Sequence, residues 1–473
     1  MKSGNIYLAA AMVILFSSCE KVINIEPDYQ LDGNERFETI DDYELALTGA
    51  YRLFRSNSYY GATNGSNAFV CLTDMISDNV NETGESLGNY TSLINWTYAE
   101  DEPNIDDTWE DAYGIIAQAN LTLRDIDKLS ATSAGAVNRI KAQALAIRAM
   151  VHFDILRYWA EEYDRNSAKP GIPYITVFDY EQKPSRGTVK AVYDQLEKDL
   201  RDAENLMASM DRAINDASRA YMDVNAINAL RARMFLYSNQ LDSAIKYSSL
   251  VINAFPLASR TQFPLVWQDA SAAEVIWSVV FNSGEGAIGD NVYFAVRNRS
   301  SFRPNQTLVA SYDQANDIRF TSYYRTISNR RVLSKYIAKQ AASTKPDGVV
   351  NFKVFRTAEM YLIRAEAYAR KGGADEVLGL NDLNTLRAVR ISGYLPVVLS
   401  GSALTTAIAT ERRKELICEG HRWFDLKRTT RTVNRANCTD FCTLPSNDRS
   451  WAWPIPLTEI NANANILPQN PGY

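Results

Sequence analysis

Histidine is nearly absent from this 473-residue chain, which has only His152 and His421. Zinc sites and Ser–His–Asp triads depend on imidazole, so this scarcity argues against both kinds of chemistry. We expect His152, on a largely apolar helical pattern, to be a hydrogen-bonded core residue, and His421, after Gly420, to be packed or exposed. Two carboxylates could still form a glycosidase site, but no local motif proposes a pair. We therefore expect no enzyme and no cofactor, with a structural Ca²⁺ left open.

Basic tracts and long apolar runs are also missing. The net charge of −6 and the lack of clustered Lys and Arg argue against nucleic-acid binding. The longest apolar run, from Ile6 to Phe16, is too short to span a bilayer, and Ser17, Ser18 and Cys19 follow it. This pattern predicts a secretory signal peptide over residues 1–18 and a bacterial lipoprotein Cys at position 19. Residues 19–34 would then be a lipidated tether.

Cysteine is scarce as well, with five in the chain. Cys438 and Cys442 enclose Thr439-Asp440-Phe441, and in an exported protein they could form a local disulfide or remain free thiols. Cys418 follows Ile417 at a predicted helix end, which favours a buried, small apolar role. The sequence does not decide between the two states of the Cys438–Cys442 pair.

Helical periodicity is abundant. The apolar positions predict helices that begin near residues 35, 106, 139 and 188, and two helix pairs, over 225–254 and 357–391. In the first pair, Ala232, Phe235, Ala244 and Pro256 fit the small, large, small and terminating positions of a tetratricopeptide repeat, although Ser248 replaces an aromatic residue. Such pairs must stack to bury their apolar faces. The sequence therefore predicts a mostly all-α, helical-repeat scaffold.

An inserted segment at about 260–355 has a different period. The stretch 274–281 is typical of a buried strand, and Asn291 to Arg297 alternates apolar and other residues like a second strand. Between them, 284–289 matches GxGxxG, but a dinucleotide site needs a helix after the glycines. We expect a hairpin loop there, and a few short strands and long loops in this insertion.

A charged and aromatic segment, Glu411–Arg428, dominates the C-terminal part. Ser402 is a candidate N-cap, and the helix is expected to end where Gly420 can adopt a left-handed conformation. Trp423 and Phe424 need a buried surface and would draw the neighbouring charges inward. We expect a packing element here. The segment ERRKELICEGHRWFDLKR resembles the C-terminal hallmark of the SusD-like (RagB/SusD) outer-membrane nutrient-binding lipoproteins of Bacteroidetes.

The resemblance extends over most of the chain, through YELALTGAYRLF, AEVIWSVVF and AEMYLIRAEAYAR. It implies a single domain over 35–473 with a tetratricopeptide-like scaffold, a lipid anchor at Cys19, and a surface-exposed position on the cell outer membrane. It also implies that the protein caps a SusC-like TonB-dependent transporter and delivers an oligosaccharide to it. Two alternatives are a peptide-binding RagB-type lipoprotein and a helical-repeat scaffold that binds protein partners only.

Sugar rings lie on aromatic planes while their hydroxyls meet polar groups, so a saccharide site needs exposed aromatic rings among polar loop residues. Tyrosine is abundant, with 26 residues. We favour Trp96 and the Tyr323-Tyr324 pair, the latter beside Arg319 and Arg325, although any one of these rings could simply pack in a loop. Tyr90 and Tyr312 also pass the test. The predicted ligand-binding residues are Tyr59, Tyr60, Trp96, Tyr98, Tyr293, Phe302, Tyr323 and Tyr324.

Overall fold

The computed structural model describes residues 37–179, 181–214, 219–282, 284–339 and 347–473. It is mostly helical, with short strands confined to small sheets, which confirms the predicted fold class. The predicted signal peptide, the tether and Cys19 lie outside the described residues. Within the described ranges, no helix is both long enough and apolar enough to cross a membrane.

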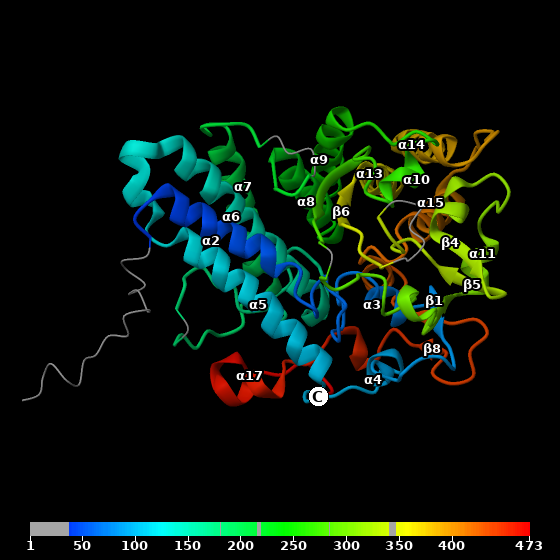
Figure 1. Cartoon of the computed structure of the whole chain (residues 1–473), viewed down its shortest axis with the longest axis horizontal. Coiled ribbons are helices and arrows are strands. Elements are labelled where there is room, and N and C mark those ends of the chain that lie inside the picture. The colour runs from blue at the N-terminus through cyan, green and yellow to red at the C-terminus, as the bar shows by residue number, and fades with distance from the viewer. Residues whose placement is uncertain (1–36, 180, 215–218, 283, 340–346) are drawn as a thin grey trace, which may run out of the picture.

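Long helices packed side by side form one half of the molecule, shown in blue, cyan and green in Figure 1. Thr39 starts the first of them with a capping box: its side chain accepts from the Asp42 N–H, and the Asp42 side chain accepts from the Thr39 N–H. The helices of this half are α2 (Ile40–Leu53), α5 (Pro103–Leu123), α6 (Ser130–Trp159) and α7 (Val189–Met207).

Two helix pairs continue the scaffold, close to the predicted bounds. They are α8 (Val224–Tyr237) with α9 (Leu241–Ala254), and α13 (Thr357–Lys371) with α14 (Asp375–Arg390). Helix α9 packs against α13, so the pairs stack as expected. Ser248, the unusual repeat position, is buried, and its hydroxyl donates to the Ala244 carbonyl at 2.6 Å. The hydroxyl therefore remains satisfied where an aromatic ring was expected.

In the described ranges, four two-stranded antiparallel sheets lie on the helical scaffold. They pair β1 (Val80–Glu82) with β3 (Phe302–Pro304), β2 (Val275–Val279) with β6 (Phe352–Arg356), β4 (Tyr324–Ile327) with β5 (Arg330–Leu333), and β7 (Val433–Asn434) with β8 (Thr443–Leu444). The buried strand expected within 274–281 is confirmed as β2.

The second strand of the insertion was predicted wrongly. The Tyr293 N–H donates to the Gly289 carbonyl at 2.9 Å, and Ala295–Arg297 forms a short 3-10 helix. Alternation of apolar and other residues predicts a strand only weakly where tight turns supply the backbone hydrogen bonds locally. Because β2 pairs with β6 instead, the segment 284–289 is not a hairpin loop.

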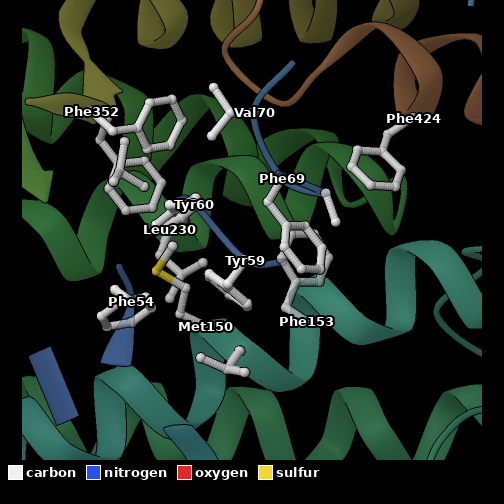
Figure 2. Close-up of a cluster of buried hydrophobic side chains, with 14 of the residues drawn as sticks. Phe54, Tyr59, Tyr60, Phe69, Val70, Met150, Phe153, Leu230, Phe352 and Phe424 are labelled. Carbon is white, nitrogen blue, oxygen red and sulfur yellow. The ribbon is translucent and has the colours of Figure 1, made fainter. Parts of the chain in front are cut away.

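Small helices complete the chain: α3 (Leu72–Met75), α4 (Thr91–Ile94), α10 (Phe263–Val266), α11 (Gln306–Ala310), α12 (Ile318–Tyr323) and α17 (Leu457–Ala462). One large apolar cluster runs from Tyr43 to Ile466 and joins both halves. Figure 2 shows its centre, where Tyr59, Tyr60 and Phe69 from the first loop lie among side chains of the helices. The first loop is thus part of the core.

The segment Glu411–Arg428 contains the end of α15 (Gly401–Glu415) and all of α16 (Arg422–Arg428). The helix ends five residues before Gly420, earlier than predicted. Gly420 has a φ of 79°, and a Cβ there would lie 2.1 Å from the Phe69 carbonyl oxygen, so close approach of the first loop requires glycine. The Trp423 ring is fully buried and stacks on Trp451 at 4.6 Å, which confirms the predicted packing role.

Most charges of this segment point inward and are paired with opposite charges, while Lys427 donates to backbone carbonyls. The Glu415 carboxylate accepts hydrogen bonds from Arg319, Arg356 and Arg390, all at 3.0 Å. Glu419 accepts from Lys335 at 2.5 Å. These neighbouring cations hold the pKa of Glu415 well below its usual range despite burial, which by itself would raise it. A buried network of this kind fixes the end of α15 and the residues after it against Arg319, Lys335 and Arg356.

Both histidines are buried. The Ile175 N–H donates to His152 Nε2 at 2.9 Å, which leaves Nδ1 as the donor to the Arg148 carbonyl at 2.8 Å. Burial lowers the pKa of His152 to about 3, and it lowers that of His421 well below 6.5. His152 is therefore the hydrogen-bonded core histidine that the sequence predicts.

Candidate ligand-binding groove

The premise behind the predicted site residues, that their rings are exposed, is wrong. Trp96 is 8% exposed, and the others are buried at least as deeply. The eight rings are those of Tyr59, Tyr60, Trp96, Tyr98, Tyr293, Phe302, Tyr323 and Tyr324, and Tyr90 and Tyr312 are buried too. In this structure none of them offers an open face to a ligand.

Internal partners explain why these tyrosines can be buried. The hydroxyl of Tyr59 donates to Asp154 at 2.6 Å, that of Tyr98 to the Ser450 carbonyl at 2.5 Å, and that of Tyr323 to the Glu415 carbonyl at 3.0 Å. A buried phenol costs little once its hydroxyl has a partner, and its ring adds a large apolar area to the core. The polar composition of a loop therefore does not reveal whether its aromatic rings point into the core or toward solvent.

Trp96 lies nearest to an open surface. Its indole N–H donates to the Ile76 carbonyl at 3.0 Å, and the guanidinium of Arg435 lies 4.1 Å from its ring centroid. The ring is thus covered by Arg435, which itself lines a cavity. Trp96 supports the wall of that cavity without forming its surface.

Only two aromatic rings in the described ranges are exposed, Phe441 at 46% and Tyr221 at 41%. Each of them lines a cavity. Large apolar side chains at the mouth of a polar cavity are a recognised feature of binding sites. These two rings therefore meet the exposure test that the predicted residues fail.

Two adjoining cavities, of about 450 and 710 Å³, meet along β1 and share Asn81, Glu82, Thr83 and Asn437. We call them together the β1 groove. The first cavity extends toward α4 and the 435–441 loop, and the second toward β3, α11 and β5. Its side chains are largely polar: Asn81, Glu82, Thr83, Asn95, Arg303, Gln306, Gln314, Arg331, Arg435, Asn437, Thr439 and Asp440.

Phe441 is presented by a small closed loop. A disulfide joins Cys438 to Cys442. Of the two possibilities that the sequence left open, a disulfide or free thiols, the structure has the disulfide. Phe441 has a φ of 54°, a left-handed conformation that is unfavourable for a bulky residue and that a closed loop can enforce. Its carbonyl accepts from Arg435 Nη1 at 3.2 Å. The ring is thus held at the cavity and kept from collapsing into the core.

Arg435 forms a fixed wall of the groove. It donates to the carbonyls of Ser77 at 2.8 Å and Ile94 at 2.9 Å, and stacks on Trp96. Burial lowers its pKa to about 10, while the more distant carboxylates Asp78 and Glu82 raise it. The side chain stays charged at neutral pH, and it shares the cavity with the carboxylates of Glu82 and Asp440.

Further contacts hold the walls together. Asn81 Nδ2 on β1 donates to the Ala436 carbonyl at 2.9 Å, which ties β1 to the 435–441 loop. Arg303 donates to Glu85 at 2.8 Å, and the guanidinium of Arg331 lies 4.6 Å from the Phe320 ring centroid. Such preorganised donors can meet a hydroxyl-rich ligand without first ordering themselves.

The groove combines one exposed apolar ring with amides, carboxylates and guanidinium groups, an arrangement suited to noncovalent binding of a polyhydroxylated molecule. Within the described ranges, no group of three or more His, Cys, Asp or Glu side chains could hold a metal ion. Sequence reasoning missed Phe441. Its place just before Cys442, in a loop that Cys438 and Cys442 could close, was the available signal, because a short cross-linked loop limits how deeply a ring within it can be buried.

Two family models match the chain. One, described as the SusD family, matches residues 305–473, and the other, described as starch-binding associating with outer membrane, matches residues 38–236. The chain belongs to the SusD/RagB family. Most residues of the β1 groove lie within these two matched regions.

Individual relatives agree with this assignment. The chain is 23% identical over 500 residues to a SusD-like protein of Formosa agariphila, covering 89% of this chain and 90% of that protein. It is also 30% identical over 148 residues to the starch-binding protein SusD of Bacteroides thetaiotaomicron, covering 28% of this chain and 23% of that protein. The first relative is similar over most of the chain, and the second is similar at higher identity over a shorter part of it.

Solved structures share the fold. A SusD superfamily protein from Bacteroides thetaiotaomicron superposes with a TM-score of 0.79 at 25% identity, covering 92% of this chain and all of that chain. A laminarin-binding SusD-like protein gives a TM-score of 0.71 at 21% identity, covering 92% and 99% of the two chains. The second likeness establishes a common fold alone.

Proposed function

We propose that this SusD-like protein captures an oligosaccharide in the β1 groove and passes it unaltered to a SusC-like TonB-dependent transporter in the outer membrane. The observation that carries the proposal is the exposed Phe441 ring, held by a disulfide-closed loop at a groove lined by polar side chains. The starch-binding description of one matching family model and the laminarin-binding structural neighbour support the same ligand class.

Sugar chemistry fits the groove. The C–H face of a pyranose would stack on Phe441, while its hydroxyls would exchange hydrogen bonds with Asn95, Asn437 and Asp440. Arg331 and the exposed amides of the second cavity would contact the next sugar units. Trp96 acts indirectly in this proposal, by holding Arg435 in place.

Affinity electrophoresis tests the ligand class. The mature protein is run through gels containing starch, laminarin or another neutral polysaccharide, with a mixture of short peptides as competitor. Retardation in at least one polysaccharide that the peptides do not relieve is the expected result. Retardation relieved by peptides, or binding to peptides alone, would instead favour the RagB-type alternative.

A patch of exposed apolar side chains supports a protein partner. Val377 and Leu378 on α14, together with Leu395 and Val398 in the connection to α15, are exposed. The connection crosses α14, because Asn384 Nδ2 donates to the Val397 carbonyl at 3.1 Å and the Gly401 N–H donates to Glu376 at 2.9 Å. Exposed apolar patches of this kind are typical of protein interfaces.

We propose this patch as the contact with the transporter. The paired changes Leu395→Glu and Val398→Glu would place charges in the interface and should prevent co-purification with a co-expressed transporter. The same changes at Leu87 and Val177 provide a matched control, since both of those side chains are exposed and lie on other segments of the chain. Equal co-purification of the two double variants would refute this docking surface.

A lipid anchor at Cys19 completes the proposal. Several acyl chains on one cysteine give stable attachment, whereas one chain alone is marginal. Cys19→Ser should abolish metabolic labelling with a radioactive fatty acid and release the protein from the membrane fraction. Persistent labelling of that variant would rule out Cys19 as the anchor.

A further inference from the structure

A third cavity, of about 420 Å³, lies away from the β1 groove. It is formed by α2, α6, residues 212–214 and Tyr221, in the half of the molecule opposite the β1 and α4 labels of Figure 1. We call it the α2 cleft. Its polar side chains include Glu44, Thr48, Arg139 and Arg212, and Tyr221 is its aromatic member.

Tyr221 is the second of the two exposed rings, and it is held in position. Its ring meets that of Tyr51 edge to face at a centroid distance of 5.1 Å. Tyr51 is itself fixed, because its hydroxyl donates to Gln143 at 2.8 Å and accepts from the Met222 N–H at 2.9 Å. A supported ring that stays 41% exposed is a ready surface for an apolar ligand face.

Glu44 is preorganised beside it. Its Oε1 accepts from Arg139 at 2.6 Å and from Arg212 at 3.3 Å, while no described residue donates to Oε2. Arg139 also binds Asp211 at 2.7 Å. An oriented carboxylate with a free oxygen is a strong acceptor for hydroxyl groups.

The described charges of the cleft are paired with one another. Glu44 meets the guanidinium groups of Arg139 and Arg212, and Arg139 also meets Asp211. The side chain of Arg212 is 66% exposed, and its guanidinium can donate to a ligand from the rim. Thr48, also exposed, adds a hydroxyl on the α2 side. An exposed aromatic ring, a carboxylate oxygen with no donor among the described residues, and a guanidinium group at the rim together match the apolar face and the hydroxyl groups of a sugar.

We propose that the α2 cleft is a second binding site for a neutral saccharide. A sugar ring lies against Tyr221, one hydroxyl donates to Glu44 Oε2, and others bond to Thr48 and Arg212. The inference rests on the proposed saccharide-binding function and adds a site to it. Two sites on one molecule hold a polysaccharide more tightly than either alone, because the second contact forms at a high effective concentration.

Hydroxyl-radical footprinting measures occupancy of the two sites separately, because the exposed rings of Tyr221 and Phe441 are each oxidised unless a bound ligand covers them. The probes are laminari-oligosaccharides and malto-oligosaccharides, titrated in parallel, with half-buried Tyr368 as the internal control. We expect saturable protection of both Tyr221 and Phe441 by at least one probe, with Tyr368 unchanged. In the Phe441→Ala variant, in which the β1 groove is impaired, Tyr221 should still be protected, with half-maximal protection at the same probe concentration.

The complementary variants complete the test. Glu44→Gln and Thr48→Val should each raise the probe concentration needed for half-maximal protection of Tyr221 by about tenfold, while the concentration needed for Phe441 stays unchanged. Protection of Phe441 without Tyr221 at saturating probe would overturn the second site and leave the proposed function standing. Protection of neither ring by any probe would overturn both. A thermal melt of each variant confirms that it is folded.

Discussion

At the scale of single residues, the two buried histidines each oppose stability as the pH falls from 6.5 to 5. His152 has a folded pKa of about 3, below its ordinary value of 6.5, because burial opposes its charged form. A base whose pKa is depressed by folding contributes stability above its unfolded pKa, and this contribution is lost as the pH falls. His152 alone should therefore cost about 2 kcal/mol of unfolding free energy between pH 6.5 and 5.

Urea unfolding at pH 6.5 and pH 5 measures this loss. His152→Gln has no proton to gain in that range, so its change in unfolding free energy from pH 6.5 to pH 5 should be about 2 kcal/mol more favourable than that of the wild type, whatever its starting stability. His421→Gln should reduce the slope in the same way, since burial also lowers the pKa of His421. An unchanged pH slope in both variants would mean that neither histidine is buried in its neutral form.

Trp423 illustrates how a single ring can stabilise the C-terminal region. Its side chain is fully buried and stacks on Trp451. Trp423→Ala should lower the free energy of unfolding by about 3 to 5 kcal/mol, because a large cavity remains in the core. Thermal and urea melts measure the loss. A normal melt combined with lost saccharide binding would show instead that the ring serves the ligand site.

At the scale of elements, the disulfide of the 438–442 loop matters for the proposed function because the loop carries Phe441. Its disulfide holds Phe441 in a left-handed conformation at the β1 groove. The double change Cys438→Ser and Cys442→Ser should free the loop, so that binding must order the ring again, and affinity should fall about threefold to tenfold. Calorimetry measures the affinity. Cys71→Ser, at a buried free cysteine far from this loop in sequence, is the control for general cysteine effects.

The end of α15 depends on its buried ion pairs. Glu415 is shared by three arginines in the core, so Glu415→Gln leaves part of their charge uncompensated. We expect a loss of about 3 to 5 kcal/mol in the free energy of unfolding. Asp202→Asn, which breaks the exposed pair with Lys198, should cost less than about 1 kcal/mol. Similar losses in the two variants would contradict a structural role for the Glu415 network.

Helical elements were predictable from the sequence and irregular ones were not. The period of apolar residues placed α9 and α13 at their observed bounds, since buried faces of long helices repeat over several turns. It failed at 291–297, where tight turns satisfy the backbone without a strand partner. It also failed to place the end of α15, because Gly420 is required by the approach of Phe69, a contact between distant segments.

At the scale of the whole molecule, the candidate site is assembled from distant parts of the chain. The β1 groove joins β1, the residues after α4, the segment around α11 and the 435–441 loop. Ring exposure is decided by this assembly, which explains why Trp96 and Tyr323 were chosen from the sequence and Phe441 was missed. Composition indicated aromatic and polar loops correctly, but only the packed structure separates rings that face solvent from rings that fill the core.

The most direct test of the account is isothermal titration of the mature protein and its Phe441→Ala variant with the oligosaccharide that binds best. Tyr368→Ala, a half-buried ring on α13, serves as the matched control. The account predicts about tenfold weaker binding for Phe441→Ala, with an unchanged melting temperature and a control that binds like the wild type. Wild-type affinity in a folded Phe441→Ala variant would contradict the assignment of the β1 groove as the binding site.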